Sequence, residues 1–256
     1  MPTRTAVTSL LDADRDLARA VPAEQAAAAR RTLAVRVDAL DRGSWKPSDE
    51  FGQDPPAVGL LVLDGLITRE ISFADRTTSE LLGTGDLLRP QDHDSGFDPL
   101  PVAVAWHVLE PARIAVLDGR FALSARPYPG VMVELAARTV RRSRALAFQL
   151  ALSQLTRVDD RLLVLFWQLA ERWGRVGTDG VRLPLELTHR TLGRLVGARR
   201  PSVTTALSGL ARDGLVERID EGWLLRGDPA EALRRRGRGT VLPPVHEELE
   251  AEEIVG

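Results

Sequence analysis

Residues 188–207 have the sequence THRTLGRLVGARRPSVTTAL, which predicts two short helices joined by a tight turn. Thr188 suits the N-cap of the first helix, because its hydroxyl can accept a hydrogen bond from a first-turn amide. Gly197 follows the last apolar position and can take the left-handed conformation that ends a helix. The second helix should begin near Arg199, with Pro201 in its first turn, where the missing N–H costs nothing. The pattern is that of a helix-turn-helix.

The second helix has the chemistry of a helix that enters the DNA major groove. Val203, Leu207 and Leu210 form its apolar face, and no acidic residue occurs between Arg199 and Arg212. Arginine suits bidentate contact with guanine, and serine or threonine suits bases or phosphates. The outward residues are Arg199, Arg200, Ser202, Thr204, Thr205 and Ser208. The alternative is an ordinary helical hairpin with a solvated arginine face.

A β-hairpin is expected directly after this helix pair. Gly214 should end the second helix, and two short apolar segments then flank Asp220, Glu221 and Gly222, which favour a turn. Such a hairpin is the wing of a winged helix. Its position after the two helices favours DNA binding over the helical-hairpin alternative.

The first half of the chain shows short apolar segments separated by turn signals, which predict a small antiparallel barrel or sandwich. Residues 58–63 and 66–71 flank Asp64 and Gly65, and we expect a β-hairpin there. Further strands are expected at residues 102–109 and 112–117. The segment before residue 33 is expected to be helical.

One long helix is expected at residues 131–155, which contain neither proline nor glycine. Its apolar residues fall on two faces, which suggests that one face packs on the β-domain and the other on a partner. The alternative is a core helix of a monomer. We expect the basic cluster on this helix to be a solvated face, with acids of a sister subunit as the alternative surroundings; it comprises Arg138, Arg141, Arg142 and Arg144.

The helix-turn-helix segment resembles the C-terminal winged helix of the Crp/Fnr family of bacterial transcription regulators. The residues that carry the resemblance are Thr188, Gly197, Arg200, Val203, Leu207, Leu210, Gly214, Leu215 and Val216. The resemblance implies that Arg200 is the main base-contacting arginine, with Ser202, Thr204 and Thr205 beside it. It also implies phosphate contacts for Thr188 and His189. Pro201 and Thr205 stand where many members have an acidic residue and a second arginine, so the operator is expected to differ from the family's best-known palindromes.

The upstream segments resemble the cyclic-nucleotide-binding β-roll of the same family, at residues 59–65 and 81–88. The Gly-Glu pair that such a pocket needs for the ribose is absent after Asp86, and Asp92 and Asp94 would repel a phosphate. We therefore expect a degenerate domain that does not bind cAMP. Residues 90–101 are the expected place for a changed effector site, and a small-molecule effector and RNA polymerase are candidate partners beside double-stranded DNA.

The expected fold class is α+β: an antiparallel β-roll of the jelly-roll kind, a long dimerisation helix and a C-terminal winged helix-turn-helix, assembled as a homodimer. The expected division is a helical segment (1–32), the β-roll (33–128), the dimerisation helix (129–157), the winged helix (158–228) and a disordered tail (229–256).

Composition excludes several classes of protein and site. The chain has 256 residues, 44% of them hydrophobic, and a net charge of −2. The absence of cysteine excludes disulfides and zinc–thiolate sites, and it fits a reducing cytoplasm. No segment is long and apolar enough for a membrane span. No catalytic constellation occurs, and no cofactor or metal is expected; we interpret Asp92, His93 and Asp94 as a solvated loop. The competing hypothesis is a protein- or ligand-interaction module whose winged helix no longer reads DNA.

Overall fold

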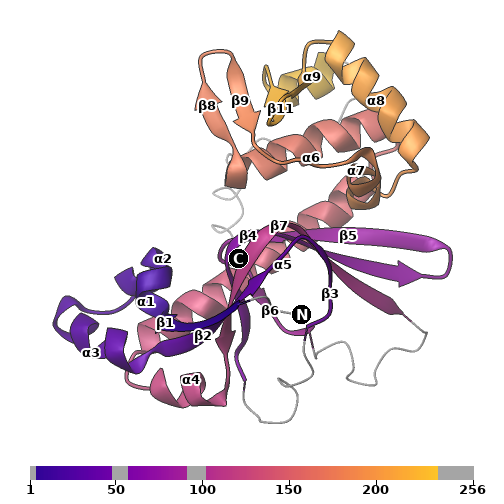
Figure 1. The fold of residues 1–256 in the computed structure, drawn as a ribbon. Helices are drawn as coiled ribbons and strands as arrows, with labels where there is room; N and C mark the ends of the chain where they lie inside the picture. Colours follow the sequence, from indigo (N-terminus) through magenta and orange to yellow (C-terminus); the bar gives the residue numbers. More distant parts are fainter. Residues whose placement is uncertain (1–3, 48–56, 91–101, 236–256) are drawn as a thin grey trace, which may run out of the picture. The chain divides into compact units, whose positions relative to one another are not determined.

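The computed structural model describes residues 4–47, 57–90 and 102–235 (Figure 1). The chain divides into two compact units, Met1–Leu150 and Ala151–Gly256. The first unit is an antiparallel β-roll with helices, and the second carries a helix-turn-helix. The predicted α+β class is thereby confirmed.

The first unit contains one sheet in which β1, β2, β7, β4 and β5 are neighbours in that order, while β3 pairs with β7 and β6 with β4. All pairs are antiparallel. The strands are β1 (Arg4–Ser9), β2 (Ala34–Leu40), β3 (Gly43–Trp45), β4 (Gly59–Phe73), β5 (Arg76–Gly83), β6 (Leu87–Leu88) and β7 (Ala103–Leu117). The helices are α1 (Leu10–Ala13), α2 (Arg15–Arg19), η1 (Ala23–Gln25), α3 (Ala26–Thr32), α4 (Gly119–Ser124) and α5 (Pro129–Ser153).

The hairpin predicted at Asp64 and Gly65 was wrong, because β4 runs through both residues as one strand of 15 residues. Its partner β7 is also 15 residues long, and the two strands pair from one end to the other. The register shifts between Val62 and Ile67, so the local turn signal produces a β-bulge instead of a reversal. Gly65 has φ +87°, and a side chain there would collide with the backbone of β7.

The N-terminal segment is not wholly helical as predicted, since its first described residues form β1. This strand pairs with β2 from Arg4 opposite Ala39 to Ser9 opposite Ala34. Helices α1 to α3 follow, and the amide of Leu10 donates to the carbonyl of Leu33 at 2.9 Å. Strand β2 is therefore paired on both sides, with β7 on one side and β1 on the other.

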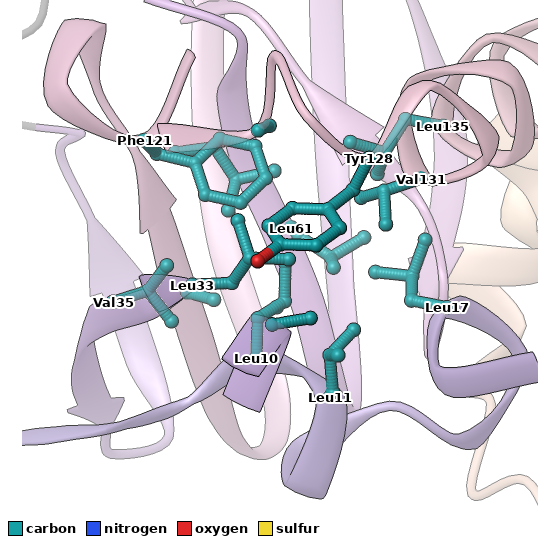
Figure 2. Packing of buried hydrophobic residues seen from close by; sticks show 14 of the residues in the cluster. Leu10, Leu11, Leu17, Leu33, Val35, Leu61, Phe121, Tyr128, Val131 and Leu135 are labelled. Atoms are coloured by element: carbon teal, nitrogen blue, oxygen red, sulfur yellow. The ribbon is translucent and has the colours of Figure 1, made fainter. Parts of the chain in front are cut away.

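Each face of the roll carries a cluster of buried apolar residues. Leu61 and Leu63 of β4 belong to a cluster with α1, α2, α4 and α5 (Figure 2), whereas Leu60 and Val62 belong to a second cluster with Trp106 and Ile114. Successive side chains of a strand point to opposite faces, so the continuous apolar sequence at residues 60–63 serves both clusters.

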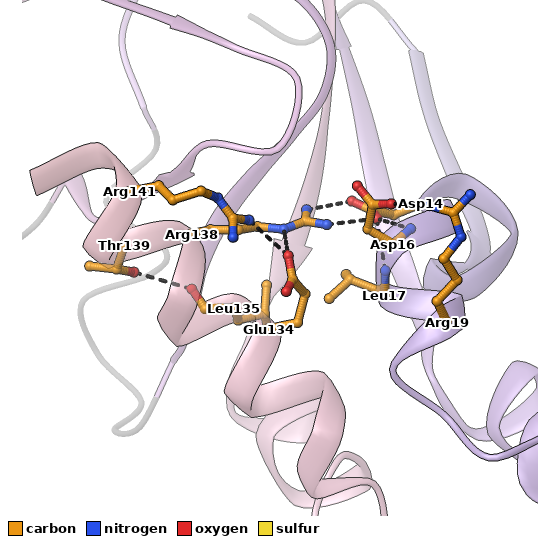
Figure 3. A network of polar contacts seen from close by, with 9 residues as sticks. All are labelled: Asp14, Asp16, Leu17, Arg19, Glu134, Leu135, Arg138, Thr139 and Arg141. Atoms are coloured by element: carbon orange, nitrogen blue, oxygen red, sulfur yellow. Dashed lines mark hydrogen bonds and ion pairs between the residues drawn. The ribbon is translucent and has the colours of Figure 1, made fainter. Parts of the chain in front are cut away.

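Arginines join α5 to the rest of the first unit, which contradicts the predicted solvated face for two of the four. Arg138 is 5% exposed and donates to both carboxylate oxygens of Asp14, at 2.5 and 2.8 Å (Figure 3). Arg142 donates to both carboxylate oxygens of Glu80, at 2.6 and 2.9 Å. Arg141 and Arg144 are exposed.

The second unit packs helices against a four-stranded antiparallel sheet in the order β10, β11, β9, β8. Phe166 and Trp223 lie in its core with ring centroids 4.8 Å apart. The elements are α6 (Val158–Trp173), β8 (Arg175–Gly177), β9 (Gly180–Leu183), α7 (His189–Val196), α8 (Arg200–Arg212), β10 (Val216–Ile219), β11 (Gly222–Leu225) and α9 (Pro229–Arg235).

The tail predicted to be disordered begins with α9. Asp228 accepts a hydrogen bond from the amide of Glu231 at 2.8 Å, and Ala232 and Leu233 are buried. This cap and these two apolar residues explain the helix; residues 236–256 lie outside the described ranges. Among the described helices, none is long and apolar enough to cross a membrane.

Candidate nucleic-acid interface

Helix α7 begins and ends at the residues that the sequence predicted. The Thr188 hydroxyl accepts a hydrogen bond from the amide of Thr191 at 3.1 Å. Gly197 takes the left-handed conformation, with φ +65° and ψ +38°, and the Ala198 amide then donates to the Gly193 carbonyl at 2.7 Å. A Cβ at Gly193 would lie 2.5 Å from the carbonyl oxygen of Ala198, so this turn requires glycine there.

Helix α8 follows this turn, with Arg199 as its N-cap residue and Pro201 in its first turn. Its end is a Schellman motif, in which Gly214 has φ +71° and the Leu215 amide donates to the Leu210 carbonyl at 3.0 Å. The buried face consists of Val203, Ala206, Leu207 and Leu210.

The outward face of α8 carries the predicted DNA-contacting residues. Arg199, Arg200, Ser202, Thr204 and Thr205 are all exposed. Within the described part of the chain, the structure records no ion pair for Arg199 or Arg200. The sequence from His189 to Arg212 contains five arginines and no acidic residue, so this surface is cationic.

The hydroxyls of α8 donate to the helix backbone. Thr204 donates to the carbonyl of Arg200 at 3.1 Å, Thr205 to that of Pro201 at 3.2 Å and Ser208 to that of Thr204 at 3.0 Å. A hydroxyl has one hydrogen and two lone pairs, so each of these oxygens can still accept a hydrogen bond.

A hollow of about 490 Å³ lies at the start of α7, lined by Thr188, His189, Arg190 and Arg200. His189 is half-buried, and its Nδ1 lies 2.9 Å from the hydroxyl oxygen of Thr204. The structure thus brings together the two predicted phosphate-contacting residues and the predicted base-contacting arginine. Sequence reasoning missed Arg190, although its place in the first turn of α7 was a usable signal.

The wing predicted after α8 is present. Residues Val216 to Ile219 pair with Gly222 to Leu225, and Asp220 and Glu221 form the turn. Two acids at this turn mean that the tip of the wing is not the cationic part of the unit. Arg218 lies on the wing with its guanidinium 4.9 Å from the ring centre of Trp223.

Hydrogen bonds and ion pairs of the protein's own side chains surround residues 81–88, which resemble part of the nucleotide-binding β-roll. The Asp86 carboxylate accepts from the Gly83 amide at 2.8 Å and closes the turn before β6. Arg142 reaches the carbonyl of Leu87 at 2.9 Å as well as Glu80, and Arg69 contacts Glu80 at 2.8 Å. Burial alone would lower the pKa of Arg142, but the hydrogen bond and charge of Glu80 raise it above its ordinary value.

Two further groups of polar residues belong to the first unit. His107 lies in β7, and its Nε2 is 3.6 Å from the carboxylate of Glu70. Asp92, His93, Asp94 and most of the proposed effector loop lie outside the described ranges. Among the described residues, no group of three or more His, Asp or Glu side chains is placed to hold a metal ion.

Residues 160–249 match the family of Crp-like helix-turn-helix domains. The second unit is a Crp-like helix-turn-helix domain. The resemblance to the Crp/Fnr family inferred from the sequence is thereby confirmed. A search of the curated proteins finds no match.

Several solved structures have a similar fold at low sequence identity. A CooA mutant from Carboxydothermus hydrogenoformans is 17% identical, covers 78% of this chain and 87% of its own, and has a TM-score of 0.62. FixK2 from Bradyrhizobium japonicum is 18% identical and has a TM-score of 0.56; the match covers 78% of this chain and 96% of FixK2. A cyclic nucleotide-binding domain containing protein from Listeria monocytogenes is 14% identical and has a TM-score of 0.60; the match covers 74% of this chain and 88% of that protein. At these identities the likenesses concern the fold alone.

Proposed function

We propose that this protein is a sequence-specific DNA-binding transcription regulator of Crp/Fnr type that acts as a homodimer. The observation that carries the proposal is the acid-free cationic surface at the start of α8, displayed by a Crp-like helix-turn-helix. Affinity for DNA would come largely from phosphate contacts and would therefore fall with salt.

In this proposal α8 enters the major groove with its N-terminal end. Arg200 pairs with the O6 and N7 atoms of a guanine, and Arg199, Ser202 and Thr205 lie beside it. Thr188 and His189 contact phosphates from α7, and Arg190 joins them because it lines the same hollow. Thr204 supports His189 across the two helices.

Dimerisation is assigned to the outer face of α5. Val133, Val140 and Leu150 are 68, 52 and 68% exposed. With Ala136, Ser143 and Ala147, all exposed, they recur at alternating spacings of three and four residues. That is the seam of a coiled coil, and a second copy of the same helix would cover it. Two-fold symmetry would then present two copies of α8 to an inverted repeat.

The β-roll is proposed to be a sensor domain that does not take cAMP, since the Gly-Glu pair that such a pocket needs is absent from the sequence after Asp86. A different small-molecule effector and RNA polymerase are further candidate partners. The regulator would act in the bacterial cytoplasm, without a cofactor and without catalytic activity.

The test is selection of bound duplexes from a genomic DNA library without added ligand, followed by sequencing. We expect an enriched inverted repeat. Arg200→Ala should then cost about 1–3 kcal/mol of discrimination at one base position. Arg212→Ala, at the far end of α8, is the matched control and should leave the base preference unchanged.

Equal losses on selected and random DNA would contradict base recognition by Arg200. Absent or salt-insensitive DNA binding would instead favour an interaction module whose winged helix no longer reads DNA.

A further inference from the structure

Two hydrogen bonds of Thr204 select one protonation pattern of His189 when they form together. The Thr204 hydroxyl, which has a single hydrogen, lies 3.1 Å from the carbonyl oxygen of Arg200 and can donate to it. When it does, the contact of 2.9 Å between this hydroxyl oxygen and Nδ1 of His189 takes its hydrogen from Nδ1. In a neutral imidazole the other nitrogen, Nε2, then carries a lone pair and no hydrogen.

This tautomer conflicts with a simple phosphate contact by neutral His189. Phosphate oxygens are acceptors, so an unprotonated Nε2 would face them lone pair to lone pair. A proton on Nε2 changes the ring into a cation with a second N–H donor, which phosphate binds strongly. Contact between His189 and DNA thus requires the uptake of a proton.

Positively charged side chains surround His189. The hollow is lined by Thr188 and the charged groups Arg190 from α7 and Arg200 from α8. Helix α6 also packs against α7 but contributes no residue to this lining. The lining is therefore positively charged, and an arriving phosphate brings the negative charge with which a second N–H donor of His189 would bond.

We propose that His189 is a proton-dependent phosphate ligand, held in its Nδ1–H form by Thr204, so that DNA affinity rises as the pH falls. The inference rests on the proposed DNA-binding function and adds to it a sensitivity to pH. Thr204 is in this scheme a positioning residue that selects the tautomer of its neighbour.

The first measurement is the tautomer of His189 in the free full-length protein, by long-range proton–nitrogen correlation NMR near pH 8. The chain has only four histidines, and His189→Gln assigns the signal. We expect the Nδ1–H tautomer in the wild type and a shift toward Nε2–H in Thr204→Val, which removes the acceptor for Nδ1.

The second measurement is the dissociation constant for a mixed-sequence duplex of about 40 base pairs at fixed salt, since phosphate contacts carry no sequence information. Between about pH 8.5 and pH 6 the wild type should bind at least roughly tenfold more tightly, the value of one charge-assisted hydrogen bond. His189→Gln and Thr204→Val should both flatten this dependence. His107→Gln, a histidine of the first unit, is the matched control and should keep it.

Three results would overturn the inference while leaving the proposed function intact: a flat wild-type profile with clear DNA binding, the full pH dependence in His189→Gln, or an Nε2–H tautomer in the wild type. A protein that binds no duplex at any pH would overturn the proposed function and the inference together. A flat pH profile in His107→Gln would also reject the inference, because the titrating group would then lie outside the interface.

Discussion

Asp14→Asn tests whether the buried ion pair between Asp14 and Arg138 stabilises the first unit. Both side chains are nearly buried, at 9 and 5% exposure. The variant keeps Oδ1, which caps α2 through the amides of Asp16 and Leu17 at 3.1 Å each. It replaces Oδ2 with an amide that faces the N–H group of Arg138, so only the charge and one acceptor are lost.

The expected loss of stability depends on the acceptors that Arg138 keeps in Asp14→Asn. Removing one partner of a buried pair costs about 3–5 kcal/mol, because the other charge is left uncompensated. Glu134 also accepts from Arg138, at 3.1 Å and with 25% exposure, so the low end of about 3 kcal/mol applies. For a unit of about 150 residues this lowers the melting temperature by roughly 6–12 °C.

The assay is differential scanning calorimetry of the full chain, with Asp16→Asn as the control. Asp16 pairs with Arg19 on the surface, where side-chain exposures are 64 and 79%, and its loss should change stability by less than about 0.5 kcal/mol. Equal melting temperatures for the two variants would refute the reasoning about the buried pair.

The same pair predicts an acid transition. Burial alone would raise the pKa of Asp14, but hydrogen bonds from Arg138 and from the amides of α2 and the charge of Arg138 bring it below the ordinary value. A lowered folded-state pKa stabilises the fold above the unfolded-state value of about 3.9, and this stabilisation is lost as the pH falls through the folded-state pKa. Wild type and Asp14→Asn should therefore begin to converge in stability below about pH 4 and meet only below the folded-state pKa of Asp14; a constant difference would contradict the linkage.

Three further predictions concern other parts of the chain. Glu80→Gln leaves Arg69 and Arg142 without their shared carboxylate and should lower the free energy of unfolding of the first unit by about 3 kcal/mol in urea denaturation; an unchanged midpoint contradicts this. Val140→Glu places a charge in the exposed seam of α5 and should yield monomers in sedimentation velocity at unchanged circular dichroism. Gly197→Ala puts a side chain at φ +65° and should destabilise the second unit by about 1 kcal/mol, whereas Gly209→Ala in the open middle of α8 should not.

The helix-turn-helix could be predicted from the sequence because its signals are local. The cap at Thr188, the left-handed Gly197 and the proline in the first turn of α8 each depend on residues within one helical turn. The outward face of α8 follows from the same periodicity. The hydrogen bond between His189 and Thr204 could not be predicted, because it depends on how α7 and α8 cross.

The errors in the first unit came from local signals that distant partners overrode. Asp64 and Gly65 favour a turn, but β7 offers a strand of equal length, and full pairing of two 15-residue strands outweighs a reversal. The N-terminal strand β1 likewise exists because β2 leaves one side unpaired. Neither partner is visible from the local sequence.

The arginines show most clearly that the local sequence does not reveal distant partners, since arginine has opposite roles in the two units. Arg138 and Arg142 lie in a basic cluster that resembles a solvated face, yet Asp14 and Glu80, more than 60 residues away, hold both in buried ion pairs. Arg199 and Arg200 look similar in the sequence but remain exposed on a surface without acids. Because salt screens exposed charges far more than buried ones, added salt should weaken DNA binding while leaving the docking of α5 on the roll nearly unchanged. The distribution of acids along the fold, and not the number of arginines, therefore decides which charges hold the protein together and which remain for a nucleic acid.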